Sequence, residues 1–173
     1  MKTSSETILK VMNLVAWVVF VGLLIEAGAV LMSYLLSLQN PEGAKNLYLG
    51  LNLFDIMQFS QAAYAASIAF YVLILLLKAF AALIVVRLLS SINIDHPFSQ
   101  EVVALILKIS RIILVAAAVV LLQRAFAFWL SEQNLQLEST SPDGFLFLAG
   151  VIYVISQLFK KGVEMQTENG LTI

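Results

Sequence analysis

The sequence predicts an all-α fold, an integral membrane four-helix transmembrane bundle. The chain has 173 residues, of which 61% are hydrophobic and 12% charged, and its mean hydropathy is +0.93. Soluble domains use only about 45–50% apolar residues, so the composition favours a membrane protein. Four apolar runs follow one another, and a helix needs roughly 20 such residues to span a bilayer. We expect residues 1–173 to form a single transmembrane domain surrounded by lipid.

The composition argues against several other classes of protein. The chain contains no cysteine, which excludes disulfides, thiolate metal sites and thiol redox chemistry. Its net charge of −1 and its lack of a dense Lys/Arg block predict no direct binding to nucleic acid. A single histidine, His96, cannot supply both axial ligands of a haem within a monomer. We therefore expect no metal and no cofactor.

No enzyme activity is expected either. The serines of "TSSE" and "SPDG" lack the His or Lys partner that would activate a nucleophile. The eight glycines are scattered and form no phosphate-binding loop.

The spans are expected at residues 8–38, 62–90, 102–130 and 143–161. The first is too long for the apolar core of a signal peptide, about 7–15 residues, so we expect it to be retained. In the connection that follows, "NPEG" is a turn signal, and the alternation in "LYLGLNLFD" fits either a short strand or an interfacial segment.

The fourth span is introduced by "SPDG", in which Ser141 can cap the helix and Pro142 can occupy its first position. Gly162, after two lysines, is read as the end of that helix. Residues 162–173 are then left as a polar tail.

The distribution of cations predicts that the N and C termini are both cytoplasmic. With that orientation the cytoplasmic side carries Lys2, Lys10, Arg87, Lys108, Arg111, Lys160 and Lys161. The outer loops carry Lys45 alone. The positive-inside rule favours this arrangement, and we expect a multi-pass protein of the bacterial cytoplasmic (inner) membrane.

Three charged residues fall inside the apolar runs and form a predicted intramembrane charge cluster: Glu26, Lys78 and Arg124. Lys78 can reach toward Glu26, and Arg124 can extend to the outer interface or to the same carboxylate. The cluster fits either a structural ion pair or a Glu26 that carries protons. A carboxylate paired with a cation is a poorer proton carrier, which favours the structural pair.

The predicted cytoplasmic turn contains "DHPFSQE" and has the features of a helix start. Pro97 interrupts the preceding helix, Phe98 can pack against the first turn, and Ser99 can cap it. We expect His96 to be a solvated loop residue, since no second ligand stands nearby at helical spacing.

The tail is expected either to dock onto a basic cytoplasmic protein or to solvate or pack against the helix end. Its candidate docking residues are Glu164, Gln166, Glu168, Asn169 and Leu171.

The segments "HPFSQEVVALILKIS" and "QLFKKGVEMQTENGLTI" resemble a family of small bacterial four-helix membrane proteins catalogued as domain of unknown function 2975. The resemblance runs from about Leu73 to the end of the chain. His96 stands where the family usually has Asn, and Gly170 where it has Asp. Members are often encoded beside a small helix-turn-helix regulator, which implies a role in signalling or regulation by analogy.

Two functions are therefore expected as alternatives. The first is a non-enzymatic sensor or regulatory partner of a cytoplasmic helix-turn-helix protein, docking through the tail and the turn at residues 95–101. The second is a small proton- or cation-coupled transporter or channel that uses Glu26. Four short spans make a narrow pore, so the second function would require a homo-oligomer.

Overall fold

Four long helices make up most of the protein. The computed structural model describes the backbone of residues 2–92, 99–139 and 141–170, and the side chains of these residues other than 2–5, 49 and 167–170. The long helices are α1 (Lys2–Gln39), α3 (Gln61–Ser91), α4 (Gln100–Ser131) and α5 (Asp143–Gly170). Between α1 and α3 lie two 3-10 turns and a short helix: η1 (Pro41–Lys45), η2 (Tyr48–Gly50) and α2 (Phe54–Phe59). The described residues contain no strand, and the predicted all-α fold is confirmed.

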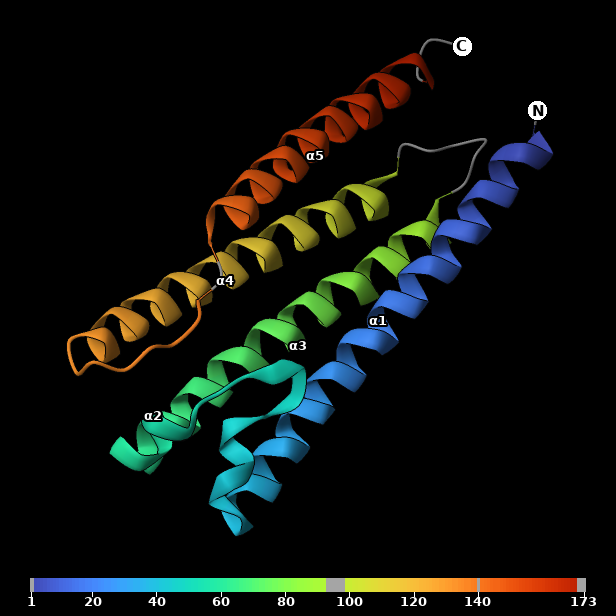
Figure 1. Cartoon of the computed structure of the whole chain (residues 1–173). Coiled ribbons are helices and arrows are strands. Elements are labelled where there is room, and N and C mark those ends of the chain that lie inside the picture. Colours follow the sequence, from blue (N-terminus) through green and yellow to red (C-terminus); the bar gives the residue numbers. More distant parts are fainter. Residues whose placement is uncertain (1, 93–98, 140, 171–173) are drawn as a thin grey trace.

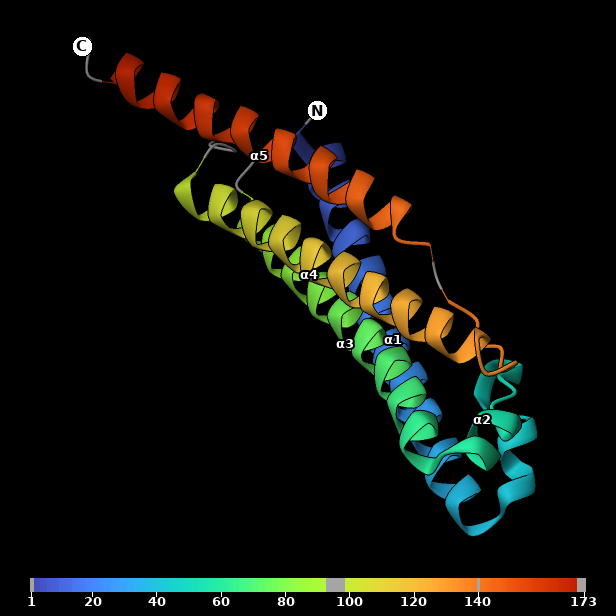
Figure 2. The same ribbon diagram turned by 90° about the vertical axis from the view of Figure 1, so that its left-hand side faces the viewer.

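The four long helices form an open bundle in which neighbours in the sequence are neighbours in space. α1 packs against α3, α3 against α4, and α4 against α5, so α1 and α5 occupy opposite edges of the row (Figure 1). The chain reverses direction at each connection. The start of α1 and the end of α5 therefore lie at one end of the molecule, here named the terminal end, together with the end of α3 and the start of α4 (Figure 2). The connector of residues 40–60 lies at the other end, here named the connector end, and the connector that follows α4 from residue 132 starts there and runs back along α4 to the start of α5 (Figure 2).

The long helices are suited to a membrane along most of their length. Four segments are long and apolar enough to cross it: Glu6–Gln39, Gln61–Ser91, Gln100–Ser131 and Asp143–Gln166. Large apolar side chains such as Leu14, Val18, Phe147 and Leu158 are exposed on the outside of α1 and α5. Soluble monomers rarely present apolar surface on this scale. The chain is a multi-pass membrane protein.

The connector end contains a well-packed core. Tyr64 is fully buried, its hydroxyl lies 2.6 Å from that of Ser37, and its ring lies 5.2 Å from that of Tyr34. The core joins α1, α3, α4 and both connectors through Val30, Ala44, Leu47, Leu53, Ile56, Ala63, Tyr64, Ile68, Val72, Leu130 and Leu137. A second cluster joins α3, α4 and α5 through Ile84, Ile109, Ile112, Ile113 and Ala149.

The predicted helix starts agree closely with the structure. The Ser99 side chain accepts a hydrogen bond from the N–H of Val102 at 3.2 Å and caps α4. Such a cap satisfies one of the N–H groups that a helix start leaves unpaired. The fourth long helix begins at Asp143, the expected first residue of the span, and the carbonyl of Pro142 accepts a hydrogen bond from the N–H of Leu146.

One sequence-based expectation about the elements is wrong. Gly162 does not end α5, which continues to Gly170; the residues after it include no Pro, Val163 is buried, and Lys161 pairs with Glu164 at 3.8 Å. A single glycine costs a helix only about 0.5–1 kcal/mol relative to alanine. The first helix begins at Lys2, ahead of the apolar run that starts at Ile8. Of the two alternatives for "LYLGLNLFD", the structure excludes the strand, because the chain turns at Gly50, whose φ is +75°.

Candidate functional site

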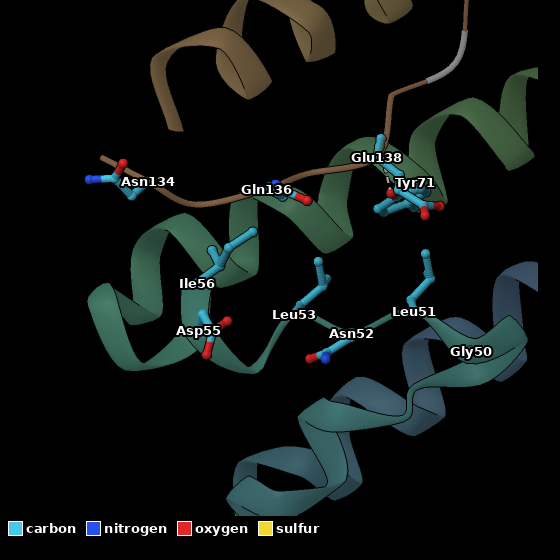
Figure 3. A pocket seen from close by; sticks show the side chains of 10 residues that line it. All are labelled: Gly50, Leu51, Asn52, Leu53, Asp55, Ile56, Tyr71, Asn134, Gln136 and Glu138. Atoms are coloured by element: carbon cyan, nitrogen blue, oxygen red, sulfur yellow. Dashed lines mark hydrogen bonds between the residues drawn. The ribbon is translucent and has the colours of Figure 1, made fainter. Parts of the chain in front are cut away.

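A polar pocket of about 430 Å³ lies at the connector end. One wall is the segment that runs from η2 into α2, and the opposite wall is the chain that follows α4 (Figure 3). Tyr71 of α3 lies between the two walls. The pocket is lined by Gly50, Leu51, Asn52, Leu53, Asp55, Ile56, Tyr71, Asn134, Gln136 and Glu138.

The first wall is folded back by backbone hydrogen bonds. The N–H of Leu47 donates to the carbonyl of Leu51, and the N–H of Leu53 donates to the carbonyl of Ala44, both at 2.9 Å. The Asn52 side-chain oxygen accepts from the N–H of Phe54 at 3.2 Å, which stabilises the start of α2. Leu47 and Leu53 are thereby buried in the core, while Asn52 is left at the pocket.

The second wall begins at an end motif of α4. Asn134 has a φ of +60°, a left-handed conformation that Asn tolerates better than most residues. The N–H of Leu135 donates to the carbonyl of Leu130, and that of Asn134 to the carbonyl of Ser131, as in a Schellman motif. From there the chain alternates: Leu135 and Leu137 pack on the core, whereas Gln136 and Glu138 line the pocket. The turn at Asn134 sets which side chains face the pocket.

Tyr71 ties the second wall to a membrane-spanning helix. Its hydroxyl donates to the backbone carbonyl of Glu138 at 2.7 Å, the contact drawn as a dashed line in Figure 3. The ring is half-buried and packs against the connector-end core. Any shift of the second wall therefore acts directly on α3.

The pocket's lining is rich in hydrogen-bond acceptors and acidic in charge. It contains two carboxylates, Asp55 and Glu138, and three side-chain amides, and none of the ten lining residues is cationic. The lysine of the same connector, Lys45, is paired with Glu42 at 2.6 Å. No group of three potential metal-ligating side chains exists in the described part of the chain. Polar groups that converge in a concave site are typical of ligand binding, and these suit a small ligand with hydrogen-bond donors or a positive charge.

The structure does not bring the predicted charge cluster together. Among the described residues, no ion pair joins Glu26 to Lys78 or to Arg124. Glu26 is half-buried on α1, and the ammonium of Lys78 lies 5.7 Å from the ring centre of Phe145 at the start of α5. Arg124 is exposed on α4. An unpaired charge at a helix centre costs about 2.5–3.5 kcal/mol on insertion scales, so Glu26 and Lys78 are each unfavourable in a bilayer unless another group pairs with them.

Residues 39–173 match the family described as "Protein of unknown function (DUF2975)". The match covers well over half of the chain and confirms the resemblance seen in the sequence. The chain belongs to this family. No curated protein and no solved structure matches it. The matched segment contains both connectors and every residue of the pocket, and it begins after Glu26.

Only part of the predicted cytoplasmic turn, residues 95–101, lies among the described residues. His96, Pro97 and Phe98 lie outside the described residues, and Ser99 caps α4. Glu101 in the first turn of α4 accepts a hydrogen bond from the Ser91 hydroxyl at 2.9 Å. That contact links the ends of α3 and α4 across the turn.

The predicted docking tail is, where described, a continuation of α5. Glu164 pairs with Lys161, and Gln166 is exposed. The side chains of Glu168 and Asn169 lie outside the described residues, as does Leu171. The first part of the tail is thus held by the fold, because Val163 is buried.

The pocket was missed by sequence analysis. Its walls come from segments about eighty residues apart, and neither carries a catalytic or metal-ligating motif. The available signal was alternation: "NLQLE" places apolar and polar residues in turn, as "LYLGLNLFD" does. Alternation of apolar and polar residues next to spanning helices indicates a connector that buries its apolar face and exposes its polar face.

Proposed function

We propose that this protein is a non-enzymatic bacterial membrane sensor that binds a small polar ligand and regulates a cytoplasmic helix-turn-helix protein. The observation that carries the proposal is the polar pocket, built by both connectors at the end opposite to the chain termini. The role of the cytoplasmic partner rests on the family analogy, because members of this family are often encoded beside such a regulator.

The proposed orientation places the pocket outside the cell and the terminal end in the cytoplasm. Lys10, Arg87, Lys108, Lys160 and Lys161 all lie in the halves of the long helices nearest the terminal end. The positive-inside rule assigns that end to the cytoplasmic face of the bacterial inner membrane.

Orientation can be tested directly because the protein has no native cysteine. A membrane-impermeant thiol reagent applied to intact cells is expected to label Asn52→Cys at the pocket. It is expected to label Gln100→Cys at the start of α4 only after lysis. Labelling of Gln100→Cys in intact cells, with labelling of Asn52→Cys only after lysis, would place the pocket in the cytoplasm and contradict the proposal.

The proposed signal passes along two helices that begin at the pocket. Tyr71 lies on α3, which leads to the turn before α4, and the wall containing Glu138 leads into α5 and the tail. A ligand that draws the walls together shifts these helices past one another, as in shear motions of packed helices. The docking segments in this proposal are the turn at residues 95–101 and the tail, with Glu164, Gln166, Glu168, Asn169 and Leu171.

The partner is tested by cross-linking in native membranes followed by a pull-down. The full chain is compared with a chain that ends after Gln166, since Val163 is buried and a shorter chain would lose that contact. A small DNA-binding protein is expected with the full chain and in much lower yield with the shortened one. Recovery of the same proteins by both would show that the last seven residues are not needed for docking.

A second candidate function is the oligomeric proton- or cation-coupled transporter or channel. It is favoured by one observation: Glu26 forms no ion pair in the described structure, and its carboxylate lies within a spanning helix. An intramembrane ionisable residue is a common feature of transport pathways. Substitution Glu26→Gln would abolish transport while leaving partner docking intact, whereas shortening the tail would do the reverse.

A further inference from the structure

We infer that the protein forms a two-fold dimer in the membrane, in which Glu26 of one copy pairs with Lys78 of the other. The inference does not depend on the sensor function. It rests on the charges of these two residues, on their depth in the membrane, and on the side of the α1 and α3 pair on which they lie. Each lies within a spanning helix, each lacks a partner of opposite charge among the described residues, and their charges are opposite.

The two residues lie at nearly the same depth. Hydrogen bonds fix the register of α1 against α3: Asn13 donates to the Val86 carbonyl and to the Ser90 hydroxyl, both at 3.0 Å, and Ser37 meets Tyr64 at 2.6 Å. With this register Glu26 is level with a point about three residues from Lys78, or about 4.5 Å along the axis. The flexible four-carbon stem of lysine bridges such an offset.

Both residues also face the pocket side of the molecule. Ser33, two turns after Glu26 on the same face of α1, accepts a hydrogen bond from the N–H of Tyr48 at 3.4 Å. Tyr48 opens η2, whose last residue lines the pocket. Tyr71, which also lines the pocket, lies two turns before Lys78 on the same face of α3. Glu26 and Lys78 therefore lie beneath the pocket, on one side of the α1 and α3 pair.

The pair does not close within one chain. The ammonium of Lys78 extends toward Phe145 of α5, which lies beyond α3 from α1 in the row of helices. Lys78 is thirteen residues from the end of α3 at Ser91, about 20 Å, and is too deep to reach the headgroups. Arg124 is seven residues from the end of α4, about 10 Å, and its side chain extends to the interface. Pairing with the carboxylate of Glu26 therefore stabilises the charge of Lys78 more than that of Arg124.

A second copy of the chain supplies the missing partners for both charges at once. Rotation about an axis normal to the membrane leaves depth unchanged, so Glu26 of each copy stays level with Lys78 of the other. A two-fold interface is self-complementary, and the same pair forms twice. The dimer thus pairs two intramembrane charges in each chain that would otherwise be left in lipid.

The test uses two differently tagged chains expressed together, one with Glu26→Cys and one with Lys78→Cys. In their dimer one native pair remains and the other is replaced by two thiols, which a short bifunctional thiol reagent can join in native membranes. The expected result is a cross-linked product that carries both tags. The absence of a mixed-tag product, or exclusive cross-linking within a chain that carries both cysteines, would overturn the inference.

Two controls separate the pair from random collision and from misfolding. Arg124→Cys paired with Glu26→Cys, and lipid-facing Val18→Cys paired with Lys78→Cys, are expected to give no mixed-tag product. Glu26→Lys and Lys78→Glu are each expected to abolish the dimer, as judged by size in mild detergent. The chain that carries both exchanges is expected to regain it, and failure of this rescue would also count against the pair.

Discussion

The connector end and the terminal end of this protein are built differently. At the connector end, one buried cluster joins α1, α3, α4 and both connectors around Tyr64, and the hydroxyls of Tyr64 and Tyr71 both have partners. Toward the terminal end, a smaller cluster joins α3, α4 and α5 and contains no residue of α1. There α1 is held to α3 by the side chain of Asn13. The start of α1 and the end of α5 lie apart in both views (Figures 1 and 2).

Under the proposed function, this difference suits the two ends to separate roles. A binding site needs walls that hold their shape, and the connector-end core fixes the pocket walls on three of the long helices. A docking site that responds to a signal needs elements that can shift, and such elements come from the less stable parts of a structure. The account therefore expects stability to be concentrated at the connector end.

The largest expected effect is that of Tyr64→Ala. Removal of a fully buried aromatic side chain costs about 3–5 kcal/mol of unfolding free energy, and here it also leaves Ser37 without its partner hydroxyl. Thermal unfolding in detergent measures the loss. Leu14→Ala, on the exposed face of α1, is the control and is expected to change little. Equal losses of unfolding free energy in the two variants would contradict the idea that stability is concentrated at the connector end.

A smaller effect of opposite sign is expected at Gln123 of α4. This side chain is fully buried, and neither its oxygen nor its nitrogen has a hydrogen-bond partner among the residues that the structure describes. An unsatisfied buried polar group costs about 1–3 kcal/mol, so Gln123→Leu should raise the unfolding temperature. Gln123→Glu, which keeps the shape and adds charge, should lower it. A fall in stability with leucine would mean that the amide has a partner in the membrane.

A cost of about 1–2 kcal/mol is expected for Asn134→Ala, because alanine is disfavoured in the left-handed conformation at this position. Asn134→Gly is the matched variant and should preserve stability, since glycine adopts that conformation freely. Thermal unfolding in detergent measures both. If alanine and glycine behaved alike, the turn would not be what fixes the second wall of the pocket.

The smallest effects are expected at the two serine caps, one at each end of the molecule. Ser60 accepts from the N–H of Ala63 at the connector end, and Ser99 from that of Val102 at the terminal end. Each change to alanine should cost about 1 kcal/mol. Hydrogen exchange should show local opening near Val102 for Ser99→Ala with the pocket unchanged. Opening of the pocket by that variant would show that the local stability of the connector end depends on a cap at the terminal end.

The sequence predicted the helices much better than the site. The boundaries of α3 and α4 agree with the expected spans within two residues, because apolar runs and serine caps both mark them. The extension of α5 beyond Gly162 was missed because a glycine ends a helix only where the chain turns, and here it continues. The helix register is likewise set by packing, so the expected pairing of Glu26 within one chain could not be judged from spacing alone.

The pocket was beyond prediction for a different reason. It requires the segments that carry Asp55 and Glu138 to line one pocket, and their placement depends on the backbone turns at Gly50 and Asn134. Alternation of leucines indicates that each connector has a buried face. It does not indicate that the opposite faces point at one another.

The central claim is that the pocket at the connector end controls the terminal end. Its most direct test joins the two walls of the pocket in the cysteine-free protein, with Asn52→Cys and Gln136→Cys linked by a short bifunctional thiol reagent. Hydrogen exchange is then compared in the linked and unlinked forms. The account predicts altered exchange at the start of α4 and in the last two turns of α5. Altered exchange confined to residues 40–60 and 132–142 would contradict it.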